Sequence, residues 1–325
     1  MKKRILAVTL MSILTVMSLT ACGSAGSAAA AGSGDTAELK MATGGTTGTY
    51  YSYSGVVAQA VSEQLDNVNI TVHSSGASKA NIFEIADGEA DMAIVQNDVA
   101  YYAYNGTDLF EEDGAVTDFS VLGAAYAEVC QVVASTDISS IADLKGKVVS
   151  VGDAGSGCEF NAHQILEAYG MTFDDITVQN LSFGDSSEAL KDGKIDAFFC
   201  VAGAPTTAIV ELATTNDIHI LNVDADQLAA LKDKYPFYTE YVIPAGTYKG
   251  VDEDTTSVAV KATFIVSNEL SEDVVYDITK FIYENSDKIV HDKATELSKE
   301  YAVDGISIPF HPGAEKYFKE VGAIQ

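Results

Sequence analysis

The sequence predicts an α/β protein made of two doubly wound lobes joined by crossover strands. Short β-type runs alternate with segments of helical periodicity, which is typical of parallel sheets covered by helices. The same series of elements recurs about 105–109 residues further along the chain, and two long apolar segments separate the repeats. With 325 residues, the chain is also long enough for two domains of ordinary size.

The first unit begins with a short strand and a turn rich in glycine and threonine. Val57, Val61 and Leu65 recur at helical spacing after this turn and predict one apolar helix face. The expected elements of this unit are strands at 38–42, 68–72 and 91–95, and helices at 50–65 and 80–86.

The second unit repeats this order. Its expected elements are strands at 148–151, 176–178 and 197–201, and helices at 158–169 and 187–191. The segments Asp87–Asp91 and Asp192–Asp196 precede the third strand of each unit and both begin with Asp-Gly. Asp-Gly turns before strands are common, but a chance turn explains the whole repeated series less well than an internal duplication does.

Two extended segments are expected to connect the lobes. Residues 119–134 cross from the first lobe to the second, and residues 258–266 cross back. After the return, Ser271 can cap a helix, and the last helices of the chain would pack on the first lobe. The predicted lobes are therefore 36–127 with 264–325, and 128–263.

The first residues read as an export signal. Three basic residues precede an apolar run, and small residues follow it, so residues 1–21 are expected to be a lipoprotein signal peptide. Cys22 then takes the lipid, and residues 22–35 form a flexible tether on the extracytoplasmic side of a bacterial membrane, in a periplasm or on the outer face of the cell membrane. An ordinary signal with a chance cysteine, or a short membrane anchor, is the alternative.

The charge excludes several classes of partner. The net charge of −28 disfavours nucleic acid and anionic lipid surfaces. Arg4 is the only arginine, so the mature chain holds any anion without a guanidinium group. Cys130, Cys158 and Cys200 are expected to be buried or cleft-wall thiols, with one disulfide and one free thiol as the alternative.

Four turns are candidates for a ligand site, because each lies between an expected strand and an expected helix. Ligands of open α/β sheets bind beyond the carboxyl ends of the strands, where helix N-termini offer free N–H groups to anions. Simple N-capping is the alternative for each turn taken alone. The four turns are 44–50, 74–78, 155–157 and 202–206, with Pro205 expected in the first turn of its helix.

The side chains around these turns suggest how a ligand would be held. A carboxylate would be bound by backbone amides, hydroxyl groups and Lys79. The expected acceptors for an amino group are Asp98, Glu159, Gln96 and Asn97, and the tyrosines expected to cover a carbon chain are Tyr50, Tyr51 and Tyr102. A structural role is the alternative for each of them.

Catalytic motifs are missing from the sequence. It contains neither a GxxxxGK[ST] phosphate loop nor a GxSxG elbow, and its five histidines lack metal-ligand spacing. Cys158 and His163 are about 140° apart on a helix, so they do not form a thiol–imidazole pair on one face. We therefore expect no enzymatic activity, no metal and no cofactor.

Several strings together resemble the solute-binding subunits of TRAP transporters of the TAXI subfamily. The strings are ATGGTTGTYY (42–51), ADGEADMAIVQND (86–98), SIADLKGKVVSVG (140–152), IDAFFCVAGAPT (195–206), YPFYTEYVIPAGTY (235–248) and HPGAEKYF (311–318). The resemblance implies a type II periplasmic-binding-protein fold, glutamate, glutamine or a related C4–C5 dicarboxylate as the ligand, and a multi-span TRAP permease as the partner. It implies that the ligand contacts come from Thr47, Gly48, Thr49, Tyr50, Ser75, Asn81, Gln96, Asn97, Asp98, Ser156, Gly157, Glu159, Ala202, Gly203 and Pro205.

The expected function is therefore capture of a small carboxylate outside the cytoplasmic membrane. The alternatives are the binding protein of an ABC importer with the same fold, a sensor or adhesin lipoprotein, and an enzyme that uses Cys158.

Overall fold

A mixed sheet organises the part of the chain that the computed structural model describes, residues 36–325. Its strands follow the order β2-β1-β3-β10-β4-β7-β5-β6, with β8 paired to β4 and β9 paired to β10. These described residues form one compact unit. The expected signal peptide 1–21, the lipidation of Cys22 and the tether 22–35 lie outside the described residues and stay predictions.

The strands and helices match the alternation that the sequence predicts. The strands are β1 Ala37–Ala42, β2 Val68–His73, β3 Met92–Gln96, β4 Phe119–Ala134, β5 Val148–Ser150, β6 Thr177–Gln179, β7 Ala197–Ala202, β8 His219–Leu221, β9 Thr239–Ile243 and β10 Thr255–Ser267. The α-helices are α1 Thr49–Gln64, α2 Ser78–Ala86, α3 Asn97–Asn105, α4 Gly157–Ala168, α5 Phe183–Lys191, α6 Thr207–Thr215, α7 Ala225–Lys234, α8 Glu272–Glu284, α9 Lys299–Val303 and α10 Pro312–Glu320. The short 3₁₀ helices are η1 Asp108–Phe110, η2 Ile141–Leu144, η3 Phe173–Asp175, η4 Ser286–Lys288 and η5 Asp292–Glu296.

The pairing of the strands confirms the internal repeat. In the first unit, β1 pairs in parallel with both β2 and β3. In the second unit, β5 pairs in parallel with both β6 and β7. Each unit therefore places its first strand between the other two, and the helices that connect them lie beside the sheet.

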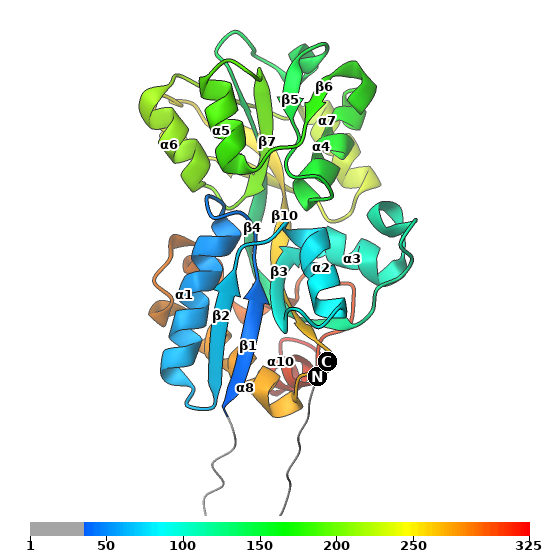
Figure 1. The fold of residues 1–325 in the computed structure, drawn as a ribbon, viewed down its shortest axis with the longest axis vertical. Coiled ribbons are helices and arrows are strands. Elements are labelled where there is room, and N and C mark those ends of the chain that lie inside the picture. The colour runs from blue at the N-terminus through cyan, green and yellow to red at the C-terminus, as the bar shows by residue number, and fades with distance from the viewer. Residues whose placement is uncertain (1–35) are drawn as a thin grey trace, which may run out of the picture. The chain divides into compact units, whose positions relative to one another are not determined.

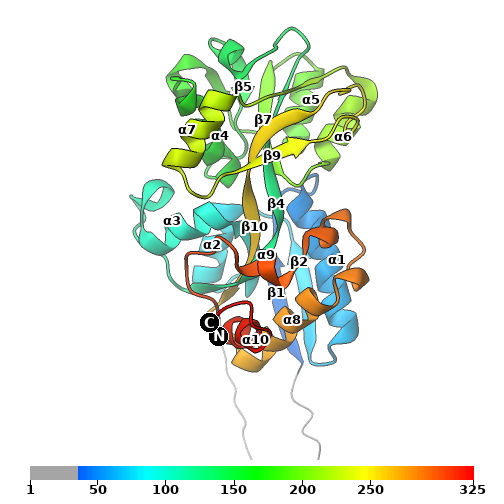
Figure 2. The same cartoon turned by 180° about the vertical axis from the view of Figure 1, so that it is seen from behind.

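The two long strands β4 and β10 join the units. They run antiparallel to each other along most of their length, and β10 also pairs with β3 while β4 pairs with β7. Figures 1 and 2 show β1–β3 grouped with α1–α3 and α8–α10, and β5–β7 grouped with α4–α7, with β4 and β10 running through both groups. We call these groups the first and second lobe. Because both crossing strands belong to each lobe, the boundaries at 127/128 and 263/264 stay a prediction.

Each lobe has apolar cores on both faces of the sheet, as a doubly wound fold requires. In the first lobe, Leu122 and Tyr126 of β4 pack with α1, α8 and α10, whereas Phe119 and Val121 pack with α2 and α3. In the second lobe, β4 contributes Cys130 and Val132 to one core and Val129 and Val133 to the other. The alternation follows from the two-residue period of a strand.

Two local expectations are wrong. Helix α5 begins at Phe183, four residues before its expected start, because the Ser182 hydroxyl accepts a hydrogen bond from the Asp185 backbone N–H at 3.2 Å and caps the helix there. Pro205 does not lie in the first turn of α6, since Thr206 is the N-cap and Pro205 precedes it after a cis peptide bond. The expected cap at Ser271 is confirmed. Across residues 36–325, the helices are too short or too polar to span a membrane.

Candidate functional site

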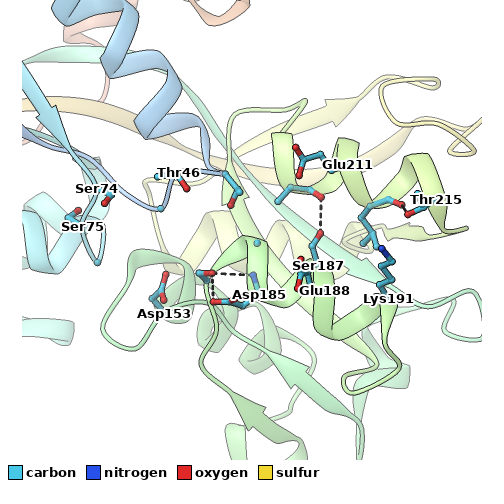
Figure 3. Close-up of a pocket in the computed structure, with 17 residues that line it drawn as sticks. Thr46, Ser74, Ser75, Asp153, Asp185, Ser187, Glu188, Lys191, Glu211 and Thr215 are labelled. Atoms are coloured by element: carbon cyan, nitrogen blue, oxygen red, sulfur yellow. Dashed lines mark hydrogen bonds between the residues drawn. The ribbon is translucent and has the colours of Figure 1, made fainter.

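Two adjoining cavities lie between the lobes, at the carboxyl ends of the parallel strands. The outer cavity has a volume of ≈ 690 Å³ and is bordered by Thr46, Ser74 and Ser75 of the first lobe and by α5 and α6 of the second (Figure 3). The inner cavity is smaller, ≈ 40 Å³, and Gly45 and Asp153 border both. The inner cavity is lined by Gly44, Gly45, Gly48, Thr49, Tyr50, Ala77, Ser78, Gln96, Glu128, Asp153, Ser156, Gly157, Cys158, Phe183, Val201 and Ala202.

The structure brings together some of the residues predicted to bind a ligand and separates others from the cavities. Those that line the inner cavity are Gly48, Thr49, Tyr50, Gln96, Ser156, Gly157 and Ala202. Those that line the outer cavity are Thr47 and Ser75. Those that line neither are Asn81, Asn97, Asp98, Glu159, Gly203 and Pro205.

Helix α1 begins at the inner cavity. Its N-cap, Gly48, has no side chain to occupy the first backbone N–H groups of the helix. The next residue, Thr49, donates its hydroxyl to the Gly203 carbonyl of the second lobe at 3.0 Å, so this hydroxyl joins the lobes. A Cβ on Gly203 would lie 2.9 Å from the Thr49 side chain, and this close approach favours glycine. The first amides of α1 therefore have no side-chain cap and are able to donate to an anion at this wall.

Helix α4 begins at the opposite wall and is capped from within. The Ser156 hydroxyl accepts from the Glu159 N–H at 3.2 Å, and the Glu159 carboxylate accepts from the Gly155 N–H at 2.6 Å. Glu159, expected to accept a ligand amino group, therefore closes its own turn instead. At Gly157 an added methyl group would overlap Oε1 of Gln96, so only glycine lets this side chain approach the helix start.

A buried polar network joins the lobes behind the inner cavity. Gln96 donates its Nε2 to Oδ1 of Asn161 at 2.7 Å. Asn161 in turn donates Nδ2 to Asp98 at 3.0 Å and to the Tyr238 hydroxyl at 2.8 Å. Burial raises the pKa of Asp98 to about 6, although the Asn161 hydrogen bond opposes this. Asp98 is therefore a lobe-joining residue in this structure, and it does not reach the cavity.

Two further candidates hold the backbone of the first lobe. Asn81 donates to the carbonyls of Thr43 and Ile94 at 2.7 and 2.8 Å, and it accepts from Ser75. Asn97 accepts from the Lys261 backbone N–H at 2.9 Å. These hydrogen bonds use both ends of the Asn81 amide and the amide oxygen of Asn97.

Lys79 and Tyr102, which were expected to contact the ligand, line neither cavity. The Lys79 ammonium pairs with Asp113 at 2.6 Å and donates to the Leu109 carbonyl at 2.8 Å, away from both cavities. Tyr102 packs its ring against Phe160 of the second lobe, with centroids 5.2 Å apart. Lys79 therefore cannot hold a carboxylate in this cleft, and Tyr102 closes the interface beside it.

Cys130, Cys158 and Cys200 are free and buried, as expected. Cys158 lines the inner cavity and donates its Sγ to the Phe199 carbonyl at 3.4 Å. Burial raises the pKa of the Cys158 thiol well above its usual range. His163 instead packs its ring against Phe173, with centroids 5.4 Å apart.

Glu128 is a cavity residue that the sequence reasoning missed. It lies on β4 between Tyr126 of one core and Cys130 of the next, is 1% exposed and lines the inner cavity. Burial raises its pKa to about 8, while the Tyr126 hydroxyl and the Lys293 ammonium lower it by less. A signal existed, because Glu128 is the only charged residue in the apolar segment Phe119–Ala134.

The outer cavity is acidic. Figure 3 shows Asp153, Asp185, Glu188 and Glu211 around it, with Lys191 also at its edge. Burial raises the pKa of Asp153, and the nearby Asp185 carboxylate adds to this. Among residues 36–325, no group of three or more His, Cys, Asp or Glu side chains is placed to hold a metal ion.

Comparisons with known proteins place this geometry in a family and a fold. Residues 41–322 match the model of the NMT1-like family. A structure from Bordetella bronchiseptica RB50 is similar with a TM-score of 0.52 at 15% identity, over 89% of this chain and 90% of that one. A putative L-cystine ABC transporter from Listeria monocytogenes is similar with a TM-score of 0.50 at 14% identity, over 82% of this chain and 95% of that one. The alkanesulfonate-binding protein SsuA from Xanthomonas axonopodis pv. citri has a TM-score of 0.47 at 13% identity, over 88% of this chain and 84% of that one. At these identities the likeness shows a shared fold, that of type II periplasmic binding proteins.

Proposed function

Since the chain belongs to the NMT1-like family and has the type II periplasmic-binding-protein fold, we propose that it is an extracytoplasmic receptor for a small carboxylate. The ligand occupies the cavities between the lobes and is then delivered to a membrane permease. The observation that supports this most is the inner cavity, which the first residues of α1, α2 and α4 line together.

The helix starts suit a carboxylate. Partial positive charge accumulates where backbone N–H groups lack partners, and the Gly48 cap leaves those of α1 free of side-chain competition. No arginine is present after Arg4. The acidic rim repels a free anion at long range, so binding depends on short contacts inside the cavity. Glutamate, glutamine and C4–C5 dicarboxylates are the ligands that we propose.

Catalysis is not part of this proposal. A thiol attacks as its thiolate, and burial keeps Cys158 in the neutral form at physiological pH. The histidine nearest to it along the chain, His163, packs against an aromatic ring and not against the thiol. The groups that line the inner cavity therefore bind and orient a ligand.

The permease is proposed to be of the TRAP type, because the strings from ATGGTTGTYY to HPGAEKYF resemble TAXI subunits. A second candidate is an ABC importer, since the similar Listeria protein is named as an ABC transporter. Uptake by membrane vesicles carrying the permease encoded beside this chain distinguishes them. Uptake driven by an ion gradient without ATP supports the first candidate, and strict dependence on ATP supports the second.

The anchor is proposed to be a lipid on Cys22. Mass spectrometry of the mature N-terminus should find a lipid-modified cysteine, and a Cys22→Ser variant should lose this processing and keep its first 21 residues. A mature chain that begins elsewhere, or a variant that is processed like the wild type, contradicts the anchor without affecting the receptor proposal.

Calorimetry tests the ligand. The purified protein is titrated with glutamate, glutamine, succinate and 2-oxoglutarate, and with methanesulfonate as a comparison. Binding of at least one carboxylate, accompanied by a more compact scattering profile, is expected. Binding of methanesulfonate or of a cation alone refutes the carboxylate proposal.

A further inference from the structure

Four buried polar atoms at the inner cavity and its floor have no hydrogen-bond partner among the described residues. They are Oε1 of Glu128, Oε1 of Gln96 and the hydroxyl oxygens of Tyr50 and Tyr126. The two hydroxyl groups face Glu128 and lower its pKa, but neither makes a hydrogen bond of ordinary geometry to Oε1. Glu128 is 1% exposed and Gln96 is 2% exposed, and both line the cavity. Leaving a buried polar atom without a partner is unfavourable, so a cluster of such atoms points to a partner that the ligand supplies.

The orientation of Gln96 follows from its neighbours. The Asp98 carboxylate accepts a hydrogen bond from Asn161, so the Asn161 amide directs Nδ2 to Asp98 and Oδ1 to Gln96. Gln96 must therefore donate its Nε2 to Asn161, and its Oε1 is left against Gly157 at the cavity wall. Oε1 of Gln96 is thus an acceptor held at the cavity wall, and Oε1 of Glu128 is a second acceptor when that carboxyl is ionised.

We propose that Glu128, together with Oε1 of Gln96, binds a primary ammonium group of the ligand. This inference rests on the proposed function, because the ligand's carboxylate is assigned to the start of α1 on the same cavity. An ammonium group offers three donors and a positive charge, which matches a carboxylate and an amide oxygen. The ligand is therefore a zwitterion, and a dicarboxylate without an amine does not satisfy the inner cavity.

The surroundings of Glu128 determine whether its carboxyl group is protonated before the ligand binds. Burial raises its pKa to about 8, so it is mostly protonated at neutral pH in the empty cavity. The titratable groups that face it are Tyr50 of α1, Tyr126 and Cys130 of β4, Cys158 of α4, Cys200 of β7, Lys293 and Glu296 of η5, and Tyr301 of α9. Lys293 does not neutralise Glu128 directly, since it pairs with Glu296 at 2.7 Å. An arriving ammonium group favours the carboxylate, and the proton of Glu128 is released to solvent.

A comparison of ligands that differ only in the amino group tests the proposal. Calorimetry measures the affinities of L-glutamate and glutarate for the wild-type protein and for the Glu128→Gln variant. We expect glutamate to bind at least 100-fold more tightly than glutarate, and Glu128→Gln to weaken glutamate about 100-fold while changing glutarate little. Glu240→Gln, which removes an exposed carboxylate of β9, is the matched control and should leave both affinities unchanged.

The proton count is a second readout, which needs no variant. Titrations in buffers of different ionisation enthalpy should show release of nearly one proton per glutamate at pH 6.5 and about a quarter of a proton at pH 8.5. The release should vanish in Glu128→Gln. If that variant does not fold, the number of protons released by the wild-type protein and its relative affinities for glutamate and glutarate still test the role of Glu128.

The outcomes separate the two proposals. Equal binding of glutarate and glutamate overturns the role of Glu128 and leaves the carboxylate receptor standing, as does glutamate binding without proton release. Equal binding would result if the protonated Glu128 donated a hydrogen bond to a second carboxylate of the ligand. Failure of the wild-type protein to bind any carboxylate refutes the proposed function, and this inference with it.

Discussion

Replacing Glu128 by Gln should stabilise the ligand-free protein at alkaline pH. In the unfolded chain this carboxyl ionises near its ordinary value of 4.5, whereas burial raises the pKa to about 8 in the folded protein. Between these two values the unfolded chain loses a proton that the folded chain keeps. The stability contributed by the protonated carboxyl is therefore complete below pH 4.5 and is lost as the pH rises towards 8.

The size of the effect follows from these two pKa values. At 1.36 kcal/mol for each tenfold change, ionisation costs the folded state about 4 kcal/mol at pH 8 and under about 1 kcal/mol at pH 5. For a body of this length the entropy of unfolding is about 0.6 kcal/mol/K, so 4 kcal/mol corresponds to about 7 °C in Tm. Gln keeps the shape of the side chain and removes the charge, so the difference between the proteins reports the carboxyl alone.

Thermal unfolding followed by circular dichroism, without ligand, is the assay. Glu128→Gln should unfold about 7 °C above the wild type at pH 8 and within about 2 °C of it at pH 5. The control Glu240→Gln should follow the wild type at both values. If Glu128→Gln is the less stable protein at both pH values, the carboxylate is ionised and paired in the empty cavity, and the reasoning about its pKa is wrong.

Two other substitutions test how the lobes meet. Gly157→Ala should weaken ligand binding at least tenfold and destabilise the protein by about 1–3 kcal/mol, because the methyl group displaces Gln96, as calorimetry and denaturant unfolding will measure. Its control, Gly55→Ala, adds a methyl group in open space within α1 and should instead stabilise the protein by about 0.5–1 kcal/mol. Asn161→Ala leaves the buried Asp98 without its side-chain donor and should cost about 2–3 kcal/mol, with a larger radius of gyration in scattering. An unchanged radius and unchanged stability would show that this network does not hold the lobes together.

Local pattern predicted most of the secondary structure. The apolar run 119–134 coincides with β4, and the run 258–266 lies within β10. The recurrence of strand, glycine turn and helix predicted that two similar units would form, and the pairing of β1 and β5 with their neighbours confirms it. These features depend on residues that are close in the chain, so the sequence exposes them directly.

The predicted residues that line the inner cavity lie at the ends of strands or the starts of helices, and they include Tyr50 and Gln96. Gly48, Thr49 and Gly157 reach the inner cavity because they begin helices that follow parallel strands, which is a consequence of the fold class. Asp98 was assigned to the ligand as a possible acceptor for an amino group, and Asn81 because of the resemblance to TAXI subunits. Each is occupied by partners far away in the chain or on neighbouring strands, and these partners cannot be read from local pattern.

The alternation of elements, the internal repeat, the crossing strands and the lack of an arginine near the cleft can all be read from the order of the residues. Which polar groups remain without partners depends on how the described residues fold together. Glu128 stood out in its strand as a single charge, yet its meaning depends on Tyr50, Tyr126 and Lys293, which three different elements bring to it. Burial and unsatisfied hydrogen bonding are properties of packing across the whole chain, and for that reason they appear only when the lobes are assembled.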